Sequence, residues 1–249
     1  MKRVRIMFKE NKFVIPAAIL GLFFLISIFV IGAAWRNHTR SNQTISVTGS
    51  AKIDIVSDFA VLRGTLTSQA ATAAESFRFL NNQKPILLEF LQKYGFPKDK
   101  VSFQTVNSYA LYEITSSGVQ TGNIRAYVYS QRFEIMFEDV NKIQNLSLDI
   151  SSLIEKGVNI SVDMPEYHYT KLAELKIQIQ AEAAKDAMNR ADKIAESTGS
   201  ELGSMRSARM GVLQITPKFS NMVSDYGVND LSSIEKEITA VVSASFEIR

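Results

Sequence analysis

The chain has no cysteine among its 249 residues, and it has only two histidines. Without cysteine there is no disulfide, no thiolate nucleophile and no Cys-based metal site. One histidine, His38, follows the N-terminal apolar segment, so His168 is the single histidine of the remaining chain. Because a zinc site needs three or four ligands, we expect no metal and no cofactor.

Motifs of common nucleotide-binding and hydrolytic families are also missing. The chain has no Walker A loop, no Gly-x-Gly-x-x-Gly and no Gly-x-Ser-x-Gly. The formal net charge is only +3, and no clustered basic face is visible, so we expect no nucleic-acid partner. These absences favour a protein that is not an enzyme.

Charged residues are absent from a long apolar run, Phe13 to Ala34. About 20 apolar residues in a helix span the hydrocarbon core of a bilayer. Residues 1–12 form a basic flank, which favours the cytoplasmic side. The pattern predicts a transmembrane helix over 13–35 with the lipid bilayer as its partner. The protein would then be single-pass in the inner (cytoplasmic) membrane.

A cleaved signal peptide is the alternative interpretation of this run. Signal peptides have an apolar region of about 7–15 residues that ends at small residues. The run is longer than that, but Gly32, Ala33 and Ala34 supply small residues near its end. In the anchored interpretation, residues 36–43 are a tether. Residues 44–249 then form one domain in the periplasm or outside the cell.

Hydrophobic periodicity divides this domain into strands and three helices. Strand patterns occur near 45–55 (two short strands or one bent strand), 59–68, 101–109, 133–137, 158–162, 202–215 and 234–248. Helical patterns occur near 72–95, 140–156 and 170–198, and each ends at a glycine. The order predicts an α+β fold, with mixed or antiparallel sheets packed with three helices.

Several side chains refine these helices. Thr72 and Glu75 form a capping box at the start of the first helix, and Pro85 predicts a kink or a break inside it. The third helix carries an alanine stripe that we assign to the core: Ala184, Ala187, Ala191 and Ala195.

A long β-hairpin with a loop near residues 116–123 is rich in tyrosine. The tyrosines near its tip are Tyr109, Tyr112, Tyr127 and Tyr129. Tyrosine is enriched at interfaces, so these residues form a candidate interaction surface. Alternatively, they alternate between the two faces of the ribbon and pack against cross-strand neighbours.

Glu166 and His168 are the best candidates for catalysis or metal binding. Strand alternation places them on one face, as two metal ligands or as a base with the group that orients it. The competing interpretation is a solvated strand end.

Residues along the domain resemble the SIMPL-domain family of bacterial periplasmic and membrane-anchored proteins. The matching residues are Ile45-Ser-Val-Thr-Gly49, Asp58, Ala60, Asn81, Gly95, Gln104-Thr105, Lys156-Gly157-Val158-Asn159, Ala184, Asp186, Ala187, Ala191, Ala195, Gly199, Leu202 and Gly203. Ala51 stands where the family often has glycine, and the hairpin tip matches nothing in the family. The resemblance covers residues 44–249.

The resemblance implies an extracytoplasmic α+β domain, assembly into rings and a link to oxidative or envelope stress. It implies no catalytic residues. We therefore expect a membrane-anchored, non-catalytic protein that self-assembles as a homo-oligomer or binds an envelope protein through the hairpin. The alternatives are a small-ligand-binding stress protein, or a hydrolase or metal enzyme centred on Glu166 and His168.

Overall fold

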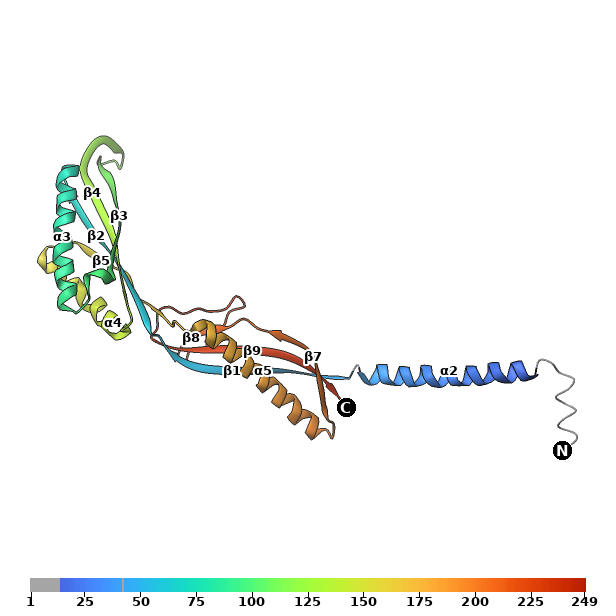
Figure 1. Cartoon of the computed structure of the whole chain (residues 1–249). Helices are drawn as coiled ribbons and strands as arrows, with labels where there is room; N and C mark the ends of the chain where they lie inside the picture. Colours follow the sequence, from blue (N-terminus) through green and yellow to red (C-terminus); the bar gives the residue numbers. More distant parts are fainter. Residues whose placement is uncertain (1–13, 42) are drawn as a thin grey trace, which may run out of the picture. The chain divides into compact units, whose positions relative to one another are not determined.

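The computed structural model describes residues 14–41 and 43–249, so the expected cytoplasmic flank, residues 1–12, lies outside the described residues. The helices are α2 (Val14–Ser41), α3 (Ala73–Lys93), α4 (Val140–Asp149) and α5 (Leu172–Ser197), with short 3-10 helices η1 (Lys98–Lys100) and η2 (Ile150–Lys156). The strands are β1 (Thr44–Val56), β2 (Phe59–Ala70), β3 (Val101–Ile114), β4 (Gln120–Phe137), β5 (Ile160–Val162), β6 (Glu166–His168), β7 (Leu202–Met210), β8 (Gln214–Pro217) and β9 (Glu235–Ile248) (Figure 1). The predicted α+β class is confirmed.

Helix α2 covers the apolar run near the N-terminus. It continues to Ser41, so most of residues 36–43, expected to be a tether, are helical. Among the described residues, no helix combines the length and apolarity needed to cross a membrane. The transmembrane character expected of residues 13–35 is therefore not supported by the structure.

The chain divides into two compact units. One unit contains residues up to 51, 180–211 and 241–249, and the other contains residues 52–179 and 212–240. We call them the split unit and the central unit.

The central unit contains a five-stranded sheet with the order β3-β4-β2-β5, in which β6 also pairs with β2. All of these pairings are antiparallel. The pairing of β2 with β4 runs from Ala60 opposite Phe137 to Ala70 opposite Tyr127. This long register fixes which side chains of the two central strands share a face.

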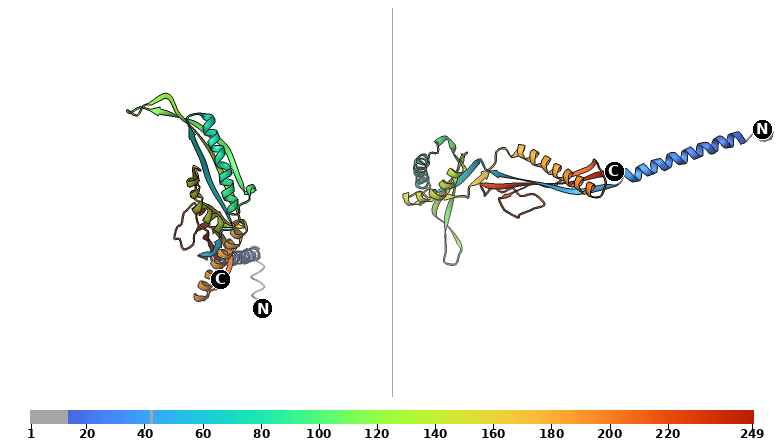
Figure 2. Two further views of the ribbon diagram at one scale, coloured as in Figure 1. Left: turned by 90° about the vertical axis from the view of Figure 1, so that its left-hand side faces the viewer. Right: turned by 90° about the horizontal axis from the view of Figure 1, so that it is seen from below.

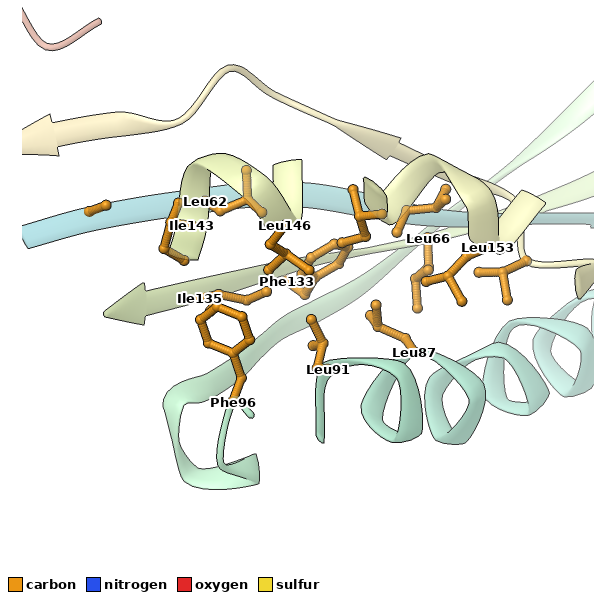
Figure 3. Packing of buried hydrophobic residues seen from close by; sticks show 14 of the residues in the cluster. Leu62, Leu66, Leu87, Leu91, Phe96, Phe133, Ile135, Ile143, Leu146 and Leu153 are labelled. Carbon is orange, nitrogen blue, oxygen red and sulfur yellow. The ribbon is translucent and has the colours of Figure 1, made fainter. Parts of the chain in front are cut away.

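One face of this sheet is covered by α3, α4 and η2. Leu62 of β2 lies opposite Ile135 of β4, and both side chains are fully buried against the helices. Figure 3 labels the main members of this core: Leu62, Leu66, Leu87, Leu91, Phe96, Phe133, Ile135, Ile143, Leu146 and Leu153. The apolar residues of the strand and helix patterns therefore pack together in one core.

Helix α3 begins as predicted and runs through its proline. The Thr72 hydroxyl oxygen accepts a hydrogen bond from the Glu75 backbone N–H at 3.3 Å, which caps the helix. The helix is continuous across Pro85, so of the predicted kink or break the break does not occur. Leu80 and Leu91, on either side of the proline, are fully buried, and this packing offsets the roughly 3 kcal/mol that an internal proline costs.

The helix predicted over 140–156 is an α-helix only to Asp149, and η2 completes it. Ile150 and Leu153 are both fully buried. A 3-10 helix has three residues per turn, which places these two side chains on one face. Gly157 ends the segment with φ of 80°, as predicted.

The β3–β4 hairpin extends past the rest of its sheet. Strand β2 accompanies β4 only as far as Tyr127, so residues 111–126 form a two-stranded segment that we call the distal ribbon. The turn is tighter than expected, because the Thr115 N–H donates to the Val119 carbonyl at 2.9 Å. Figure 2 shows the ribbon projecting away from α3 in both views.

In the split unit, α5 packs on a sheet with the order β1-β9-β7. The alanine stripe is buried, as predicted, but it begins at Ala183 and not at Ala184, which is partly exposed. Ile45 and Val47 of β1 pack against the same small core.

The C-terminal third contains more strands than the sequence predicts. The strand predicted over 202–215 is divided into β7 and β8. Strand β6 agrees with the strand alternation assumed for Glu166 and His168. Residues 218–234 contain no regular strand or helix. Strand β9 confirms the strand pattern predicted over 234–248, and its buried face holds Ile238, Ala240, Val242, Ala244 and Phe246.

Candidate functional site

The four tyrosines of the hairpin do not share one surface. Tyr109 and Tyr112 have exposed fractions of 58% and 41%. Tyr127 and Tyr129 are half-buried, and the Tyr129 ring meets the Phe77 ring of α3 edge-on, with centroids 5.8 Å apart. The structure thus places two tyrosines where a partner can reach them, whereas Tyr129 packs within the central unit.

Aliphatic side chains extend this exposed surface along the distal ribbon. Tyr112 lies opposite Ile124 across the two strands. Ile114 and Val119 flank the turn, with exposed fractions of 69% and 62%. We define the ribbon surface as the exposed side chains Tyr109, Tyr112, Ile114, Val119 and Ile124. They lie on both faces of the hairpin, because Tyr109 and Tyr112 are three residues apart on β3. The sequence analysis missed its aliphatic members, although their position beside a predicted turn was a usable signal.

The backbone of the distal ribbon is also accessible. Residues 111–126 of β3 and β4 pair with each other, and β2 does not reach them. The outer edges of a two-stranded ribbon carry N–H and C=O groups that can pair with another strand. The register shifts near Leu111 and Tyr112 twist the ribbon locally.

Glu166 and His168 belong to a polar cluster on the central unit. The carboxylate of Glu166 accepts a hydrogen bond from Nη1 of Arg63 at 2.5 Å, and Nε of Arg63 donates to Glu134 at 2.6 Å. The hydrogen bond to Glu134, together with the charges of both carboxylates, raises the pKa of Arg63 despite its partial burial. His168 Nε2 lies 3.4 Å from Glu166.

This arrangement resembles an ion-pair network more than a catalytic pair. The Arg63 guanidinium engages both carboxylates, with side chains that are partly exposed. Among the described residues, no three His, Cys, Asp or Glu side chains gather as a metal site would require. The structure therefore brings Glu166 and His168 together, and it adds Arg63 and Glu134, which the sequence analysis did not single out.

Lys236 is a buried lysine that the sequence analysis did not single out. Its side chain is 2% exposed, on the buried face of β9. Nζ donates to the backbone carbonyls of Tyr167 at 2.6 Å and Asp230 at 2.5 Å. Burial lowers the pKa of Lys236, although the charge of Asp230 opposes this shift. Through these two hydrogen bonds, Lys236 of β9 connects β6 to the loop before β9.

The split unit has a hydroxyl-rich hollow of about 580 Å³. Ser46 of β1 contacts Ser245 of β9, and Thr48 contacts Ser243, each with oxygen atoms 3.3 Å apart. Arg209 of β7 adds one cation to the lining. These hydroxyls already bond one another across the strands, so they make a polar sheet face.

Comparisons with known proteins agree with the resemblance seen in the sequence. Residues 45–246 match the family described as "SIMPL: Protein of unknown function (DUF541)". Because the match covers most of the chain, this protein belongs to the SIMPL family. A curated relative, the uncharacterized protein YggE of Edwardsiella ictaluri, is 21% identical over 177 residues, which is 70% of this chain and 70% of that protein. The family region begins in β1 and ends in β9 and so includes both compact units.

Proposed function

We propose that this SIMPL protein is an extracytoplasmic, membrane-anchored, non-catalytic protein that works by association through the ribbon surface. The single observation that carries this proposal is the distal ribbon, residues 111–126, which leaves the sheet and exposes apolar side chains along its length. The association is either self-assembly into a homo-oligomer, which we favour, or binding of an envelope protein. A role in oxidative or envelope stress follows from the family resemblance.

Physical chemistry supports a partner for the ribbon. An isolated two-stranded ribbon is marginally stable in water. Burial of apolar surface contributes about 25 cal/mol per Å², and tyrosine and aliphatic side chains together are typical of interface cores. An occupied ribbon surface would bury Tyr109, Tyr112 and Ile114 and pair the open strand edges.

The polar cluster supports the non-catalytic part of the proposal. Arg63 binds both Glu134 and Glu166, so the Glu166 carboxylate already has a cationic partner. His168 is about one-third exposed, as is Glu166. This environment is typical of a solvated ion pair.

Sedimentation velocity of the full chain in detergent micelles tests the association. The variant Tyr109→Ser/Tyr112→Ser removes the two exposed rings of the ribbon, and we expect it to shift the protein from an oligomer to a monomer. Tyr226→Ser is the matched control, because Tyr226 is 96% exposed but lies in the loop before β9. An oligomer that is unchanged by the double substitution, or a wild-type monomer, would contradict self-assembly through the ribbon surface.

The proposed anchor is the segment 13–35. It is supported by the uncharged run from Phe13 to Ala34 and by the basic flank before it.

The absence of native cysteine makes the topology directly testable. We expect a membrane-impermeant maleimide to label Asp225→Cys in intact spheroplasts, and to label Lys2→Cys only after lysis. Mass spectrometry of the purified chain distinguishes an intact anchor from cleavage near Ala34. Labelling of Lys2→Cys in intact spheroplasts, or extraction of the intact chain by alkaline carbonate, would contradict the anchored topology.

A further inference from the structure

Strand β1 has an open edge in the split unit. Among the strands that the structure describes, the order β1-β9-β7 gives β1 a neighbour on one side only. The Gln43 carbonyl faces β9, since it accepts a hydrogen bond from the Ile248 N–H at 3.2 Å. The Ser50 N–H faces the other way and donates to Asp186 of α5 at 2.8 Å. Because backbone direction alternates along a strand, Ser46 and Thr48 also direct their N–H and C=O groups away from β9.

A groove of about 510 Å³ lies beside this edge. Val47 and Thr48 of β1 form one wall, and residues from α5 form the other: Asn189, Arg190, Lys193 and Ile194. Asp186, Arg190 and Lys193 share one side of the helix, because residues three and four apart are neighbours on a helix surface. The same side of α5 that binds the Ser50 N–H therefore borders the groove.

The groove combines apolar side chains with positive charge. Val47 and Ile194 are the apolar lining residues, and Arg190 and Lys193 are the charged ones. Arg190 binds Asp186 through Nε at 2.7 Å, and this contact orients its guanidinium along the helix. Lys193 forms only an exposed pair with Glu196, with side chains 75% and 59% exposed, and such pairs are weak. Both cations can therefore bind a further anion.

We propose that the β1–α5 groove binds an extended acidic segment of another protein as an added strand. The segment would pair with the outward N–H and C=O groups of Ser46 and Thr48, since strand addition to a sheet edge supplies main-chain hydrogen bonds. Side chains facing α5 would alternate between apolar residues beside Ile194 and a carboxylate beside Arg190. This groove lies in the split unit, whereas the ribbon surface lies in the central unit, and the two have no residue in common. An experiment can therefore contradict one proposal without contradicting the other.

Fluorescence anisotropy with a defined probe tests this site. The probe is a labelled seven-residue peptide, TVTDTVT, which presents valine and aspartate on one face of an extended strand. The protein is the full chain in detergent micelles. We expect submillimolar binding that weakens roughly tenfold when lysine replaces the aspartate of the probe, because the charge-assisted contact with Arg190 is lost.

Three variants locate the contact. Thr48→Pro removes one outward N–H, and proline is tolerated on edge strands, so we expect a loss of about tenfold in affinity. Thr48→Val removes the hydroxyl but keeps the N–H and should bind normally. Ala208→Pro places proline on β7, the opposite edge of the sheet, and should also bind normally. Arg190→Gln, which leaves the backbone intact, should reduce binding of the aspartate probe only.

Absence of probe binding to the wild-type chain would overturn the proposal. Equal loss for Thr48→Pro and Ala208→Pro would overturn it as well, since it would indicate a general loss of structure. If Thr48→Pro does not fold by circular dichroism, the Arg190→Gln result decides alone. A drop in oligomer mass caused by Thr48→Pro would assign the edge to a second copy of this chain and overturn the acidic-segment proposal.

Discussion

Gly49 of β1 lies directly against Ala187 of α5. A Cβ added at Gly49 would come within 2.2 Å of the Ala187 backbone nitrogen and 2.4 Å of the Ala183 carbonyl oxygen. Strand and helix therefore meet backbone to backbone, which only glycine and alanine permit. This contact explains why the stripe of α5 is alanine and why the split unit has so small a core.

Gly49→Ala should destabilise the split unit. Since the atoms in the way belong to the backbone, α5 must shift, and overpacking of this kind costs about 1–3 kcal/mol or more. The measurement is the thermal unfolding midpoint of the full chain by circular dichroism. Gly122→Ala is the control, because no atom lies within 4 Å of a Cβ added there. Equal midpoints for the two variants would show that α5 does not pack this closely.

Arg63→Met should lower the free energy of unfolding by about 1–2 kcal/mol. This value lies between those of exposed and buried ion pairs, because the Arg63 and Glu134 side chains are 28% and 13% exposed. His168→Ala should change it by less than about 0.5 kcal/mol, since the contact with Glu166 is long and exposed. Chemical denaturation measures both, and a larger effect for His168→Ala would mean that the cluster is organised around the histidine.

Asp186→Asn should have an effect that depends on pH. The hydrogen bond from the Ser50 N–H, together with Arg190, lowers the pKa of Asp186. A carboxyl group with a lowered folded-state pKa stabilises the fold above its unfolded value of about 3.9, and this contribution is lost as the pH falls through the folded value.

The unfolding midpoint of Asp186→Asn should therefore be below that of the wild type at neutral pH and should converge with it in acid. Asp192→Asn, an exposed change on the same helix, should match the wild type at both pH values. A constant difference between Asp186→Asn and the wild type across the range would contradict this linkage.

Gln83→Leu should weaken the attachment of β5 to the central unit. Gln83 Nε2 donates to the Thr67 carbonyl at 2.9 Å, and its Oε1 accepts from the Asn159 N–H at 2.7 Å. Leucine would remove both part-buried hydrogen bonds, at a cost of about 0.5–1.5 kcal/mol each. Hydrogen exchange at Asn159 should accelerate, whereas the exposed change Gln92→Leu should leave it unaltered. Unaltered exchange in Gln83→Leu would show that the glutamine is not the connection.

Pro85 and Lys236 show where sequence reasoning failed. Proline in a helical pattern predicts a kink or a break, but the buried leucines on both sides of Pro85 keep α3 continuous, without a break. A lysine at a strand start is normally solvated, whereas Lys236 is buried by β6 and a loop distant in sequence. Both outcomes depend on tertiary neighbours that no local pattern reports.

The tyrosine hairpin was predicted as a unit, but its division into exposed and packed residues was not. Strand alternation gives two faces, and Phe77 of α3 covers the face that holds Tyr129. The end of β2 at Ala70 decides where the ribbon becomes free of the sheet. The sequence pattern indicates roughly where β2 ends. That Ala70 lies opposite Tyr127 follows only from the pairing of β2 with β4.

The sequence by itself determined the α+β class, the helix ends at Gly95, Gly157 and Gly199, the alternating buried face of β9 and the family. These features follow from backbone preferences and from periodicity, which act over a few residues. Only the tertiary structure decided the two compact units, the open edge of β1 beside α5 and the ion pairs of Arg63. Each of these depends on which distant segments pack together, because the neighbours of a side chain in space decide whether it is buried and which groups it binds.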